Sequence, residues 1–394
     1  MKNKIRNIVK KMTIVFYRMM VKILPVQKKV ILFESNLGRN YTGNPRAIYE
    51  EFVRHGLDKE YQCVWFFENP RKKIPGEAKV VKRARLTYLY YMAIGGVWIF
   101  DCRQPEFLIK RAETTYIQTW HGTPLKKLAL DMERIDSVVS SSIEEYHEAF
   151  RKNTSTWDYL LSQNRFSTDI FRRCFAFGDK PILEIGYPRN DILFRNNNPE
   201  YISRLKEKLG IPLDKKVILY APTWRDNAFH SQGRYKFVSP LDFDKAREVL
   251  GGEYVFLVKY HYLVADQIDW SPYEGFVYSF DEKVDIARLY LAADLLITDY
   301  SSVMFDYSLL GRPMFFFAYD LEEYKDSLRG FYFDFLAEAP GPISKDTDQL
   351  LEDILHYDGD QWKERYDAFF AKYNHADDGK ASIKVMEVVN ELLR

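Results

Sequence analysis

The chain alternates short apolar runs with amphipathic segments, and this alternation limits the folds that it can adopt. In the first half, the runs expected to form strands are Val30–Glu34, Cys63–Phe67, Val97–Cys102, Tyr116–Trp120, Tyr159–Ser162 and Ile182–Ile185. The segments expected to form helices are Pro45–Arg54, Leu86–Ile94, Ser142–Lys152 and Thr168–Phe175. Apolar strands separated by helices form a parallel sheet with helices on both faces. The first half is therefore predicted to be an α/β domain.

The alternation stops at the segment FRNNNPEYISRLKEKLGIPLDKK and then starts again. Further strands are expected at Val217–Ala221, Tyr254–Lys259, Phe276–Tyr278, Leu295–Thr298 and Met314–Phe317, with helices at Lys283–Ala292 and Val303–Leu310. A length of 394 residues with 46% hydrophobic residues is enough for two cores. We therefore predict two doubly wound Rossmann-type domains, residues 28–195 and 196–394, that face each other across a cleft. The helices Thr347–His356 and Ile383–Leu393 are expected to close the second domain, unless the last one crosses back to the first.

Residues 1–27 have a different character. Residues 1–30 carry nine Lys and Arg residues and no acidic residue, although the net charge of the chain is only +1. Apolar residues recur there at intervals of three and four, as in one face of a helix, and the longest uncharged run is too short to cross a bilayer core of ~30 Å. No signal-peptide pattern is present. We expect an amphipathic helix on an anionic membrane surface; the alternative is a surface helix packed against its own domain.

Ligands of doubly wound sheets bind beyond the carboxyl ends of the strands, so the candidate site residues are those at which predicted strands end. One predicted strand of the first half runs into QTWHGTPLKKL. His121 is of the residue type that moves protons near neutral pH, and Gly122 lets the backbone approach a ligand. Thr123 and Pro124 are expected to begin a helix whose N-terminus would attract an anion. The alternative is a histidine that merely caps a turn.

In the second half, a predicted strand ends at Thr223, Trp224 and Arg225. The guanidinium of an arginine at a strand end is suited to phosphate oxygens, so this stretch is a candidate phosphate site. The alternative is a surface ion pair with Asp226.

The next strand of the second half ends in KYH. Lys259 and His261 are two residues apart and would lie on the same face of an extended chain. A cation beside an imidazole suggests a second phosphate contact. The alternative is that both side chains lie on an exposed edge strand.

The stretch TDYSSVMFDY completes the candidates. Thr298 and Asp299 end a strand, and the hydroxyls of Ser301 and Ser302 open a helix, where unpaired backbone N–H groups favour a phosphate. Asp306, one turn later, could bind sugar or polyol hydroxyls. The alternative is ordinary helix capping, with Asp306 in solvent.

No sequence pattern for metal or nucleophile chemistry is present. The chain has no P-loop, no HExxH and no GxSxG, and its three cysteines lack the spacing of metal ligands. We therefore expect no metal and no cofactor, with phosphate held by cations and helix termini.

Taken together and in this order, QTWHGTPLKKL, GYPRND, YAPTWRD, KYH and TDYSSVMFDY resemble the CDP-glycerol glycerophosphotransferase family of wall teichoic acid synthesis. The resemblance covers nearly the whole chain, including FESNLGRNYTGNPRAIYEEF, and no departure is found at these motifs. It implies a GT-B-like fold. It also implies transfer of glycerol phosphate from the donor substrate CDP-glycerol to a membrane-bound polyprenyl-diphosphate-linked acceptor, with release of CMP.

The resemblance assigns roles to single residues. His121 would be the general base, and His261 the second catalytic residue, which with Lys259 would hold the diphosphate. The residues expected to bind substrate are Gly122, Thr123, Pro124, Leu125, Pro188, Arg189, Thr223, Trp224, Arg225, Lys259, Tyr260, Thr298, Asp299, Ser301, Ser302 and Asp306.

The expected location is peripheral, on the cytoplasmic face of the membrane. The expected partners are the lipid-linked acceptor, the anionic membrane surface and other wall teichoic acid enzymes, and no nucleic acid. Without the long N-terminal extension of the larger polymerases, the chain looks more like a short primase or single-step extender.

Four alternatives stay open at the level of sequence. They are a GT-B glycosyltransferase that uses a nucleotide sugar, a nucleotide-sugar epimerase, a ribitol phosphate transferase that uses CDP-ribitol, and a catalytically silent membrane-bound scaffold. The sequence also leaves open the number of units added and the oligomeric state.

Overall fold

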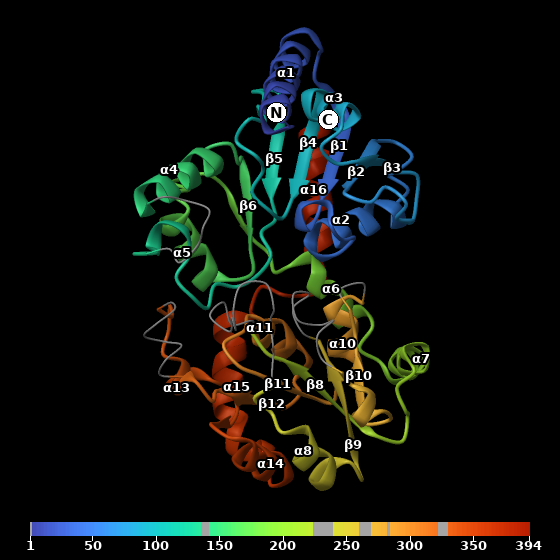
Figure 1. Cartoon of the computed structure of the whole chain (residues 1–394), viewed down its shortest axis with the longest axis vertical. Helices are drawn as coiled ribbons and strands as arrows, with labels where there is room; N and C mark the ends of the chain where they lie inside the picture. The colour runs from blue at the N-terminus through green and yellow to red at the C-terminus, as the bar shows by residue number, and fades with distance from the viewer. Residues whose placement is uncertain (1, 135–141, 224–238, 260–268, 282–283, 322–329) are drawn as a thin grey trace. The chain divides into compact units, whose positions relative to one another are not determined.

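The chain forms two compact units, each built on one parallel sheet (Figure 1). The computed structural model describes residues 2–134, 142–223, 239–259, 269–281, 284–321 and 330–394. The first unit comprises Met1–Gly122, Leu128–Asp191 and Ala376–Arg394. The second unit comprises Thr123–Lys127 and Ile192–His375.

The described strands of the first unit form a seven-stranded parallel sheet in the order β3-β2-β1-β4-β5-β6-β7. Their bounds are β1 (Gln27–Glu34), β2 (Gln62–Phe67), β3 (Lys79–Lys82), β4 (Gly95–Phe100), β5 (Thr115–Gln118), β6 (Tyr159–Ser162) and β7 (Ile182–Glu184). The chain winds outward from β1 to β3 and then restarts at β4 on the other side of β1. This is the Rossmann order, and it has its switch point between β1 and β4.

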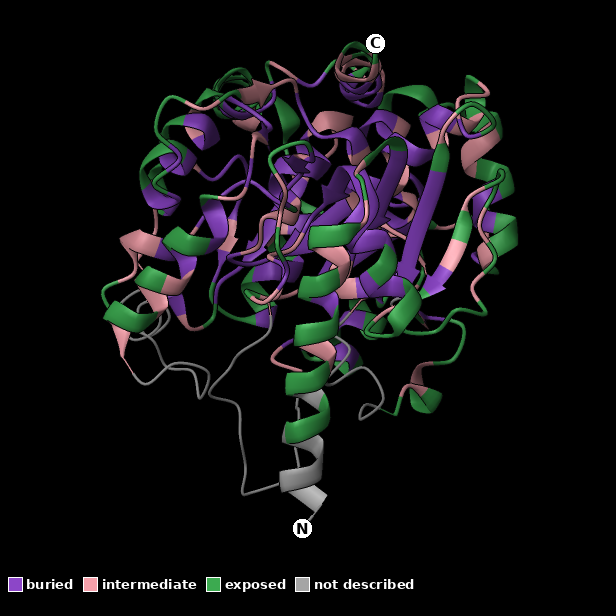
Figure 2. Ribbon diagram, turned by 90° about the horizontal axis from the view of Figure 1, so that it is seen from above, coloured by how far each residue is buried: buried purple, intermediate pink, exposed green. Residues whose placement is uncertain are grey.

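Helices cover both faces of this sheet. On one face, α2 (Gly43–Arg54) and α16 (Ala381–Leu393) share a core with the strands, in which the rings of Phe33 and Trp65 stack with centroids 5.5 Å apart. On the opposite face, α3 (Leu86–Ile94) places Tyr88 against Phe66. Two further helices, α4 (Ile143–Thr154) and α5 (Arg165–Cys174), connect the last three strands. Figure 2 shows that the strands are largely buried beneath these helices.

The N-terminal helix α1 (Lys2–Ile23) is attached to the first unit by one face only. It packs on α3, and the buried Tyr17 accepts a hydrogen bond of 3.1 Å from the backbone N–H of Ile109. Seven of its other apolar side chains are 47–73% exposed: Ile8, Val9, Met12, Val15, Phe16, Met19 and Ile23. Ile14, Met20 and Val21 are half-buried. Within the described ranges, no helix combines the length and the hydropathy that a membrane-spanning segment needs.

The described strands of the second unit repeat the same order, β10-β9-β8-β11-β12-β13, and all of them are parallel. Their bounds are β8 (Lys216–Ala221), β9 (Tyr254–Val258), β10 (Val277–Ser279), β11 (Leu295–Thr298), β12 (Met314–Phe317) and β13 (Ile343–Ser344). The switch point of this sheet lies between β8 and β11.

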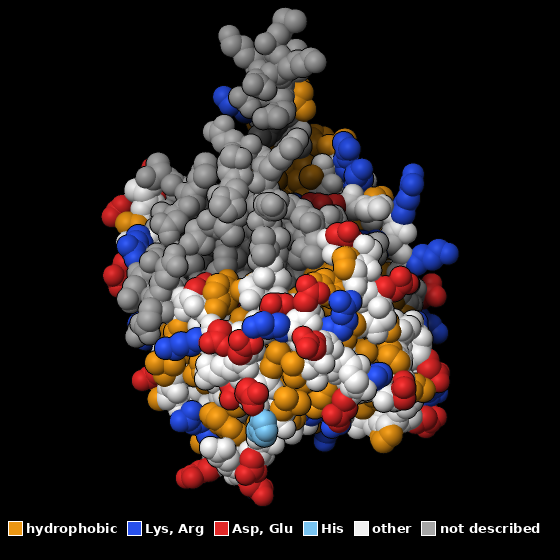
Figure 3. Space-filling model, turned by 60° about the horizontal axis from the view of Figure 1, so that its bottom comes forward, with side chains coloured by type: hydrophobic (Ala, Val, Ile, Leu, Met, Phe, Trp, Pro, Cys, Tyr) orange, Lys and Arg blue, Asp and Glu red, His pale blue; other side chains and the backbone are white. Residues whose placement is uncertain are grey.

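One face of the second sheet is covered by α8 (Phe243–Leu250) and α14 (Thr347–Leu355), which share a core with β8, β9, β11 and β12. The other described helices are α6 (Asp191–Arg195), α7 (Pro199–Leu209), α10 (Ile286–Ala292), α11 (Val303–Tyr307), α13 (Phe335–Glu338) and α15 (Gly359–Tyr373). Figure 3 shows basic and acidic side chains intermixed on one face of the molecule. One ion pair, between Lys245 and Asp348 at 2.9 Å, joins α8 and α14.

The predicted α/β class with two doubly wound parallel sheets is confirmed. The strands β3 and β13 and the helices α8 and α15 were not predicted. The two strands have only four and two residues, too few for a clear alternation of apolar and polar side chains. The last helix differs from the expectation that it closes the second domain. It lies in the first unit, against α2, and thus takes the crossing-back course that the sequence left open.

Two buried aspartates attach α16 to the first unit. The carboxylate of Asp191 accepts the backbone N–H groups of Ala381 and Ser382 at 3.0 and 2.8 Å, and so caps the helix N-terminus. The carboxylate of Asp377, just before the helix, accepts the backbone N–H of Tyr187 at 3.1 Å. Gly186 makes room for it, because a Cβ there would lie 2.8 Å from an oxygen of Asp377.

We predict that Asp191→Ala lowers the free energy of unfolding by about 2–3 kcal/mol, since two buried backbone donors lose a charged acceptor. Asp358→Ala is the matched control, because it removes an exposed cap from α15 and is expected to cost about 1 kcal/mol. Urea denaturation of both variants measures the difference. Equal losses would contradict a special role of Asp191 in attaching the last helix.

Candidate functional site

The candidate site of the first unit lies at the switch point of its sheet. Ser35 follows β1, Asp101 follows β4, and His121 lies three residues beyond β5. Because these strands are adjacent and parallel, their carboxyl ends bring the three residues together. The site is thus built from segments that are far apart in the sequence.

The imidazole of His121 is anchored through one ring nitrogen. Its Nδ1 lies 3.0 Å from the backbone oxygen of Asp101, while the residue as a whole is exposed. The described structure gives Nε2 no partner, so this nitrogen is the one that can exchange a proton with a bound molecule.

Trp120 fixes the plane of the His121 ring. Its φ of +52° is uncommon for a residue with a side chain and costs roughly 1–2 kcal/mol. The indole of Trp120 stacks on the imidazole of His121 with ring centroids 4.4 Å apart. The indole also packs against the ring of Phe175. Backbone strain of this kind persists only where the surroundings hold it, and it is found preferentially at functional sites.

The side chain of Asn44, in the first turn of α2, supplies part of that hold. Its amide nitrogen donates to the backbone oxygens of Thr119 and Trp120, both at 3.1 Å. Its oxygen accepts the backbone N–H of Arg189 at 3.1 Å, and the guanidinium of Arg189 donates to the backbone oxygen of His121. The expected site residues His121 and Arg189 are therefore brought together, with the buried Pro188 beside them.

One sequence expectation in this region is wrong. No helix begins at Thr123 and Pro124; the chain is extended there and pairs with residues 330–332. Lys127 donates its backbone N–H to Gly330, and Leu125 accepts that of Tyr332. These backbone pairs satisfy the segment without a helix, so the anion site that a helix N-terminus would have formed here is absent from the described structure. Gly122 and Thr123 are both buried.

In the second unit, three expected residues meet at the switch point between β8 and β11. Asp299 accepts the backbone N–H of Thr223 at 2.8 Å, and the hydroxyl of Thr298 donates to the backbone oxygen of Ala221 at 2.8 Å. These bonds tie together the carboxyl ends of the two strands. The hydroxyl of Thr298 therefore has a structural partner.

Lys259 lies at the end of β9, on the other side of β8. Its ammonium donates to the backbone oxygens of Asp281 and Val284 at 2.8 and 2.7 Å, beyond the end of β10. Its expected contact with a diphosphate stays a prediction.

The residues that precede and enter α11 are the last described candidates. Ser301 and Ser302 are half-buried before the first turn, and Asp306 is 3% exposed. The alternative interpretation of this helix placed Asp306 in solvent, and the burial of Asp306 contradicts it. The expected site residues Trp224, Arg225, Tyr260 and His261 lie outside the described residues.

Sequence reasoning did not identify Asn44, Asp101 or Ser35 as parts of the site. Asn44 and Ser35 both belong to the stretch FESNLGRNYTGNPRAIYEEF, in which a run of small polar residues between a strand and a helix was the available signal. Among the described residues, no group of three His, Cys, Asp or Glu side chains could hold a metal ion.

Residues 15–391 match the family model described as CDP-Glycerol:Poly(glycerophosphate) glycerophosphotransferase. The chain belongs to this family. It is 46% identical over 376 residues to the teichoic acid poly(glycerol phosphate) polymerase of Bacillus subtilis (strain 168), which covers 94% of this chain and 50% of that protein. It is 39% identical over 393 residues to the teichoic acid glycerol-phosphate transferase of Staphylococcus aureus (strain NCTC 8325 / PS 47), covering 98% of this chain and 99% of that protein.

A solved structure of the wall teichoic acid polymerase TagF matches the chain with a TM-score of 0.92 and 41% identity, over 99% of this chain and 96% of that one. The chain spans about half the length of the Bacillus subtilis polymerase and nearly all of the Staphylococcus aureus transferase. The family resemblance drawn from the five motifs is thereby confirmed, together with the GT-B-like fold that it implied.

Two further relatives are less similar to this chain. The teichoic acid ribitol-phosphate primase of Bacillus spizizenii (strain ATCC 23059 / NRRL B-14472 / W23) is 30% identical over 398 residues. The teichoic acid glycerol-phosphate primase of Bacillus subtilis (strain 168) is 31% identical over 299 residues, which cover 73% of this chain.

We predict that Asn44→Ala lowers the free energy of unfolding by about 2–3 kcal/mol, because two buried carbonyl groups lose their donor. It should also shift the NMR signals of the His121 ring, which depends on the same loop. Asn69→Ala is the control, since the exposed Asn69 accepts only a local hydrogen bond from Arg71 and should change stability by no more than about 0.5 kcal/mol. Unchanged His121 signals in Asn44→Ala would refute the role of Asn44 in holding the loop.

Proposed function

We propose that this protein transfers glycerol phosphate from CDP-glycerol to a lipid-linked teichoic acid acceptor and releases CMP. The observation that carries the proposal is the anchored, exposed imidazole of His121 at the switch point of a Rossmann sheet, in a chain of this family. Relatives named as glycerol-phosphate polymerase and transferase support glycerol over ribitol in the donor.

In the proposed step, a hydroxyl oxygen of the acceptor attacks the β-phosphorus of CDP-glycerol. A new O–P bond forms, and the bond between the β-phosphorus and the bridging oxygen breaks, so that CMP leaves with the electron pair. Nε2 of His121 takes the proton of the attacking hydroxyl. Most of the catalysis in phosphoryl transfer comes from positioning and electrostatic stabilisation, which fits a site without a nucleophile of its own.

We propose that the donor binds on the second unit, at the carboxyl ends of β8 and β11. Asp299 and Thr223 link these strand ends, and Ser301, Ser302 and Asp306 follow on the next segment. We propose that these residues contact the diphosphate and the glycerol, together with Arg225, Lys259 and His261.

The acceptor is proposed to be a polyprenyl-diphosphate-linked disaccharide that already carries glycerol phosphate. The greater similarity to the polymerase and the transferase than to the glycerol-phosphate primase supports an extender over a primase. Such an acceptor lies in a membrane, so the enzyme must work at a membrane surface, where we also propose that it meets other enzymes of wall teichoic acid synthesis.

We propose that α1 makes the membrane contact, on the cytoplasmic face. Tyr17 attaches the helix to the first unit, while other apolar side chains of the helix stay exposed. The helix belongs to residues 1–30, which are rich in Lys and Arg. Burial of these side chains at the interface and attraction of the cations to anionic lipids would act together.

The donor assay tests the proposed reaction. Purified protein is given CDP-glycerol, CDP-ribitol or UDP-N-acetylglucosamine, each with a lipid-linked disaccharide acceptor with and without one glycerol phosphate. We expect CMP from CDP-glycerol, formed at least about tenfold faster with the primed acceptor, and at least about tenfold less from CDP-ribitol. Equal CMP release from CDP-ribitol would indicate a ribitol phosphate transferase. Release of UDP would indicate a glycosyltransferase, and release of no nucleotide from any donor would indicate a scaffold.

The triple variant Met12→Glu, Phe16→Glu, Met19→Glu tests the membrane contact. We expect binding to phosphatidylglycerol-containing vesicles to weaken at least about 100-fold, because each apolar side chain contributes up to ~1.5–3 kcal/mol on burial. Activity on a soluble acceptor analogue should persist, since Tyr17 is unchanged. The control variant Leu213→Glu, Leu336→Glu, Leu355→Glu alters side chains that are 48–53% exposed elsewhere and should bind vesicles like the parent protein. Equal vesicle binding by both variants would exclude α1 as the anchor.

A further inference from the structure

The contact between His121 and Asp101 determines which nitrogen of the imidazole carries the proton. The partner of Nδ1 is a backbone oxygen, which can only accept a hydrogen bond. Nδ1 must therefore carry hydrogen, and in the neutral ring the lone pair lies on Nε2. The backbone of Asp101 thus selects the tautomer that a base acting through Nε2 requires.

The side chain of the same residue is a buried carboxylate beside this ring. Asp101 is 5% exposed, and its two carboxylate oxygens accept the hydroxyl of Ser35 at 2.7 Å and the backbone N–H of Asn36 at 2.8 Å. Asn36 and Leu37 have φ of +46° and +52°, so the chain after β1 adopts an unfavourable conformation that points this N–H at Asp101. Two donors aimed at one buried carboxylate favour its charged form.

Charge on Asp101 and charge on His121 depend on each other. Burial raises the pKa of the Asp101 carboxyl, and the positive charge of His121 opposes that rise. The carboxylate and the ring are therefore close enough for their charges to interact.

The other ionisable groups around this pair have partners or stay neutral. Glu34, on β1, is buried, and its ion pair with Arg83 at 2.8 Å and a hydrogen bond from Gln104 at 2.7 Å hold its carboxylate. Burial raises the pKa values of Cys102 and Tyr116, which keeps both groups protonated. Tyr88, on α3, lies near Glu34. Arg189 donates a hydrogen bond to the backbone oxygen of His121. Asp101 is therefore the described acidic residue that contacts His121, through its backbone oxygen.

We propose that Asp101 is a positioning residue for the reaction, which fixes the Nδ1–H tautomer of His121 through its backbone oxygen and stabilises the imidazolium through its carboxylate. The inference rests on the proposed function, in which Nε2 takes the proton of the acceptor hydroxyl. Each turnover would create the imidazolium beside a negative charge that is already in place, so no group has to rearrange when the proton moves.

The tautomer is measured on the unaltered protein. Protein labelled with ¹⁵N-histidine contains seven histidines, and the His121 signals are those absent from His121→Asn. We expect the neutral ring of His121 to show the Nδ1–H tautomer. The Nε2–H tautomer would overturn the proposal.

The carboxylate is tested with Asp101→Asn, which keeps the shape, the backbone oxygen and an acceptor for Asn36. Loss of the negative charge makes the imidazolium less stable, so the proton leaves His121 at lower pH. If the proposal holds, the titration midpoint of His121 is lower in this variant than in the parent protein. The acid limb of the pH profile of kcat should move the same way, while kcat at its plateau falls about tenfold and KM for CDP-glycerol stays within about twofold.

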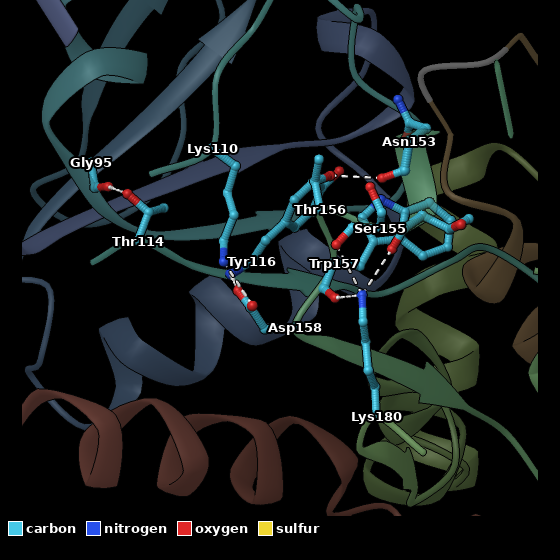
Figure 4. Close-up of polar contacts among 11 residues, drawn as sticks. Gly95, Lys110, Thr114, Tyr116, Asn153, Ser155, Thr156, Trp157, Asp158 and Lys180 are labelled. Carbon is cyan, nitrogen blue, oxygen red and sulfur yellow. Dashed lines mark hydrogen bonds and ion pairs between the residues drawn. The ribbon is translucent and has the colours of Figure 1, made fainter. Parts of the chain in front are cut away.

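Asp158→Asn is the matched control, because it neutralises a carboxylate at the amino end of β5, the strand whose other end carries His121. Asp158 accepts the backbone N–H of Tyr116 and the ammonium of Lys110, both at 2.7 Å (Figure 4). This variant should lose stability but leave the His121 titration and the pH profile unchanged. A midpoint that is unmoved in Asp101→Asn, or equally moved in both variants, would overturn the proposal. Absence of CMP release by the parent protein would instead refute the proposed function, and the NMR results would still decide the role of Asp101.

Discussion

The hydrogen bond between Nδ1 of His121 and the backbone oxygen of Asp101 is the contact on which the candidate site depends. It exists because β4 and β5 are parallel neighbours, with Phe100 opposite Gln118, so their carboxyl ends leave the sheet together. A continued strand would carry His121 past this point. The left-handed conformation of Trp120 turns the chain instead and returns the imidazole to the level of Asp101.

That turn is unfavourable by itself, and several side chains hold it. The side-chain amide of Asn44 donates to the backbone oxygens of Thr119 and Trp120. The side chain of Gln118 accepts the backbone N–H of Trp120 at 3.0 Å, and the indole packs against Phe175. The motif GYPRND contributes Arg189 to the same loop and, through Asp191, the cap of the last helix. One motif thus serves both the site and the attachment of the last helix to the first unit.

The sequence was sufficient to predict the two Rossmann sheets and the placement of His121, because both follow from local patterns: apolar runs of strand length and a histidine at a strand end. It was not sufficient for Asp101 and Asn44, whose partners are 20 and 75 residues away and are brought near only by the strand order. At Thr123, by contrast, local sequence predicted a helix that the structure does not form. Its capping residues were suitable, but backbone pairing with residues 330–332, a tertiary contact, prevailed over local propensity.

The central claim is that His121 is the base of a phosphoryl transfer from CDP-glycerol, and a single-turnover measurement on His121→Asn tests it most directly. Radiolabelled CDP-glycerol and a primed acceptor are mixed with excess enzyme, and CMP is quantified by rapid quench, while calorimetry reports the donor affinity of the same variant. The account predicts a rate at least about 10²–10³-fold below that of the parent protein, with unchanged donor affinity. A rate within about tenfold of the parent, at equal donor affinity, would show that another group removes the proton.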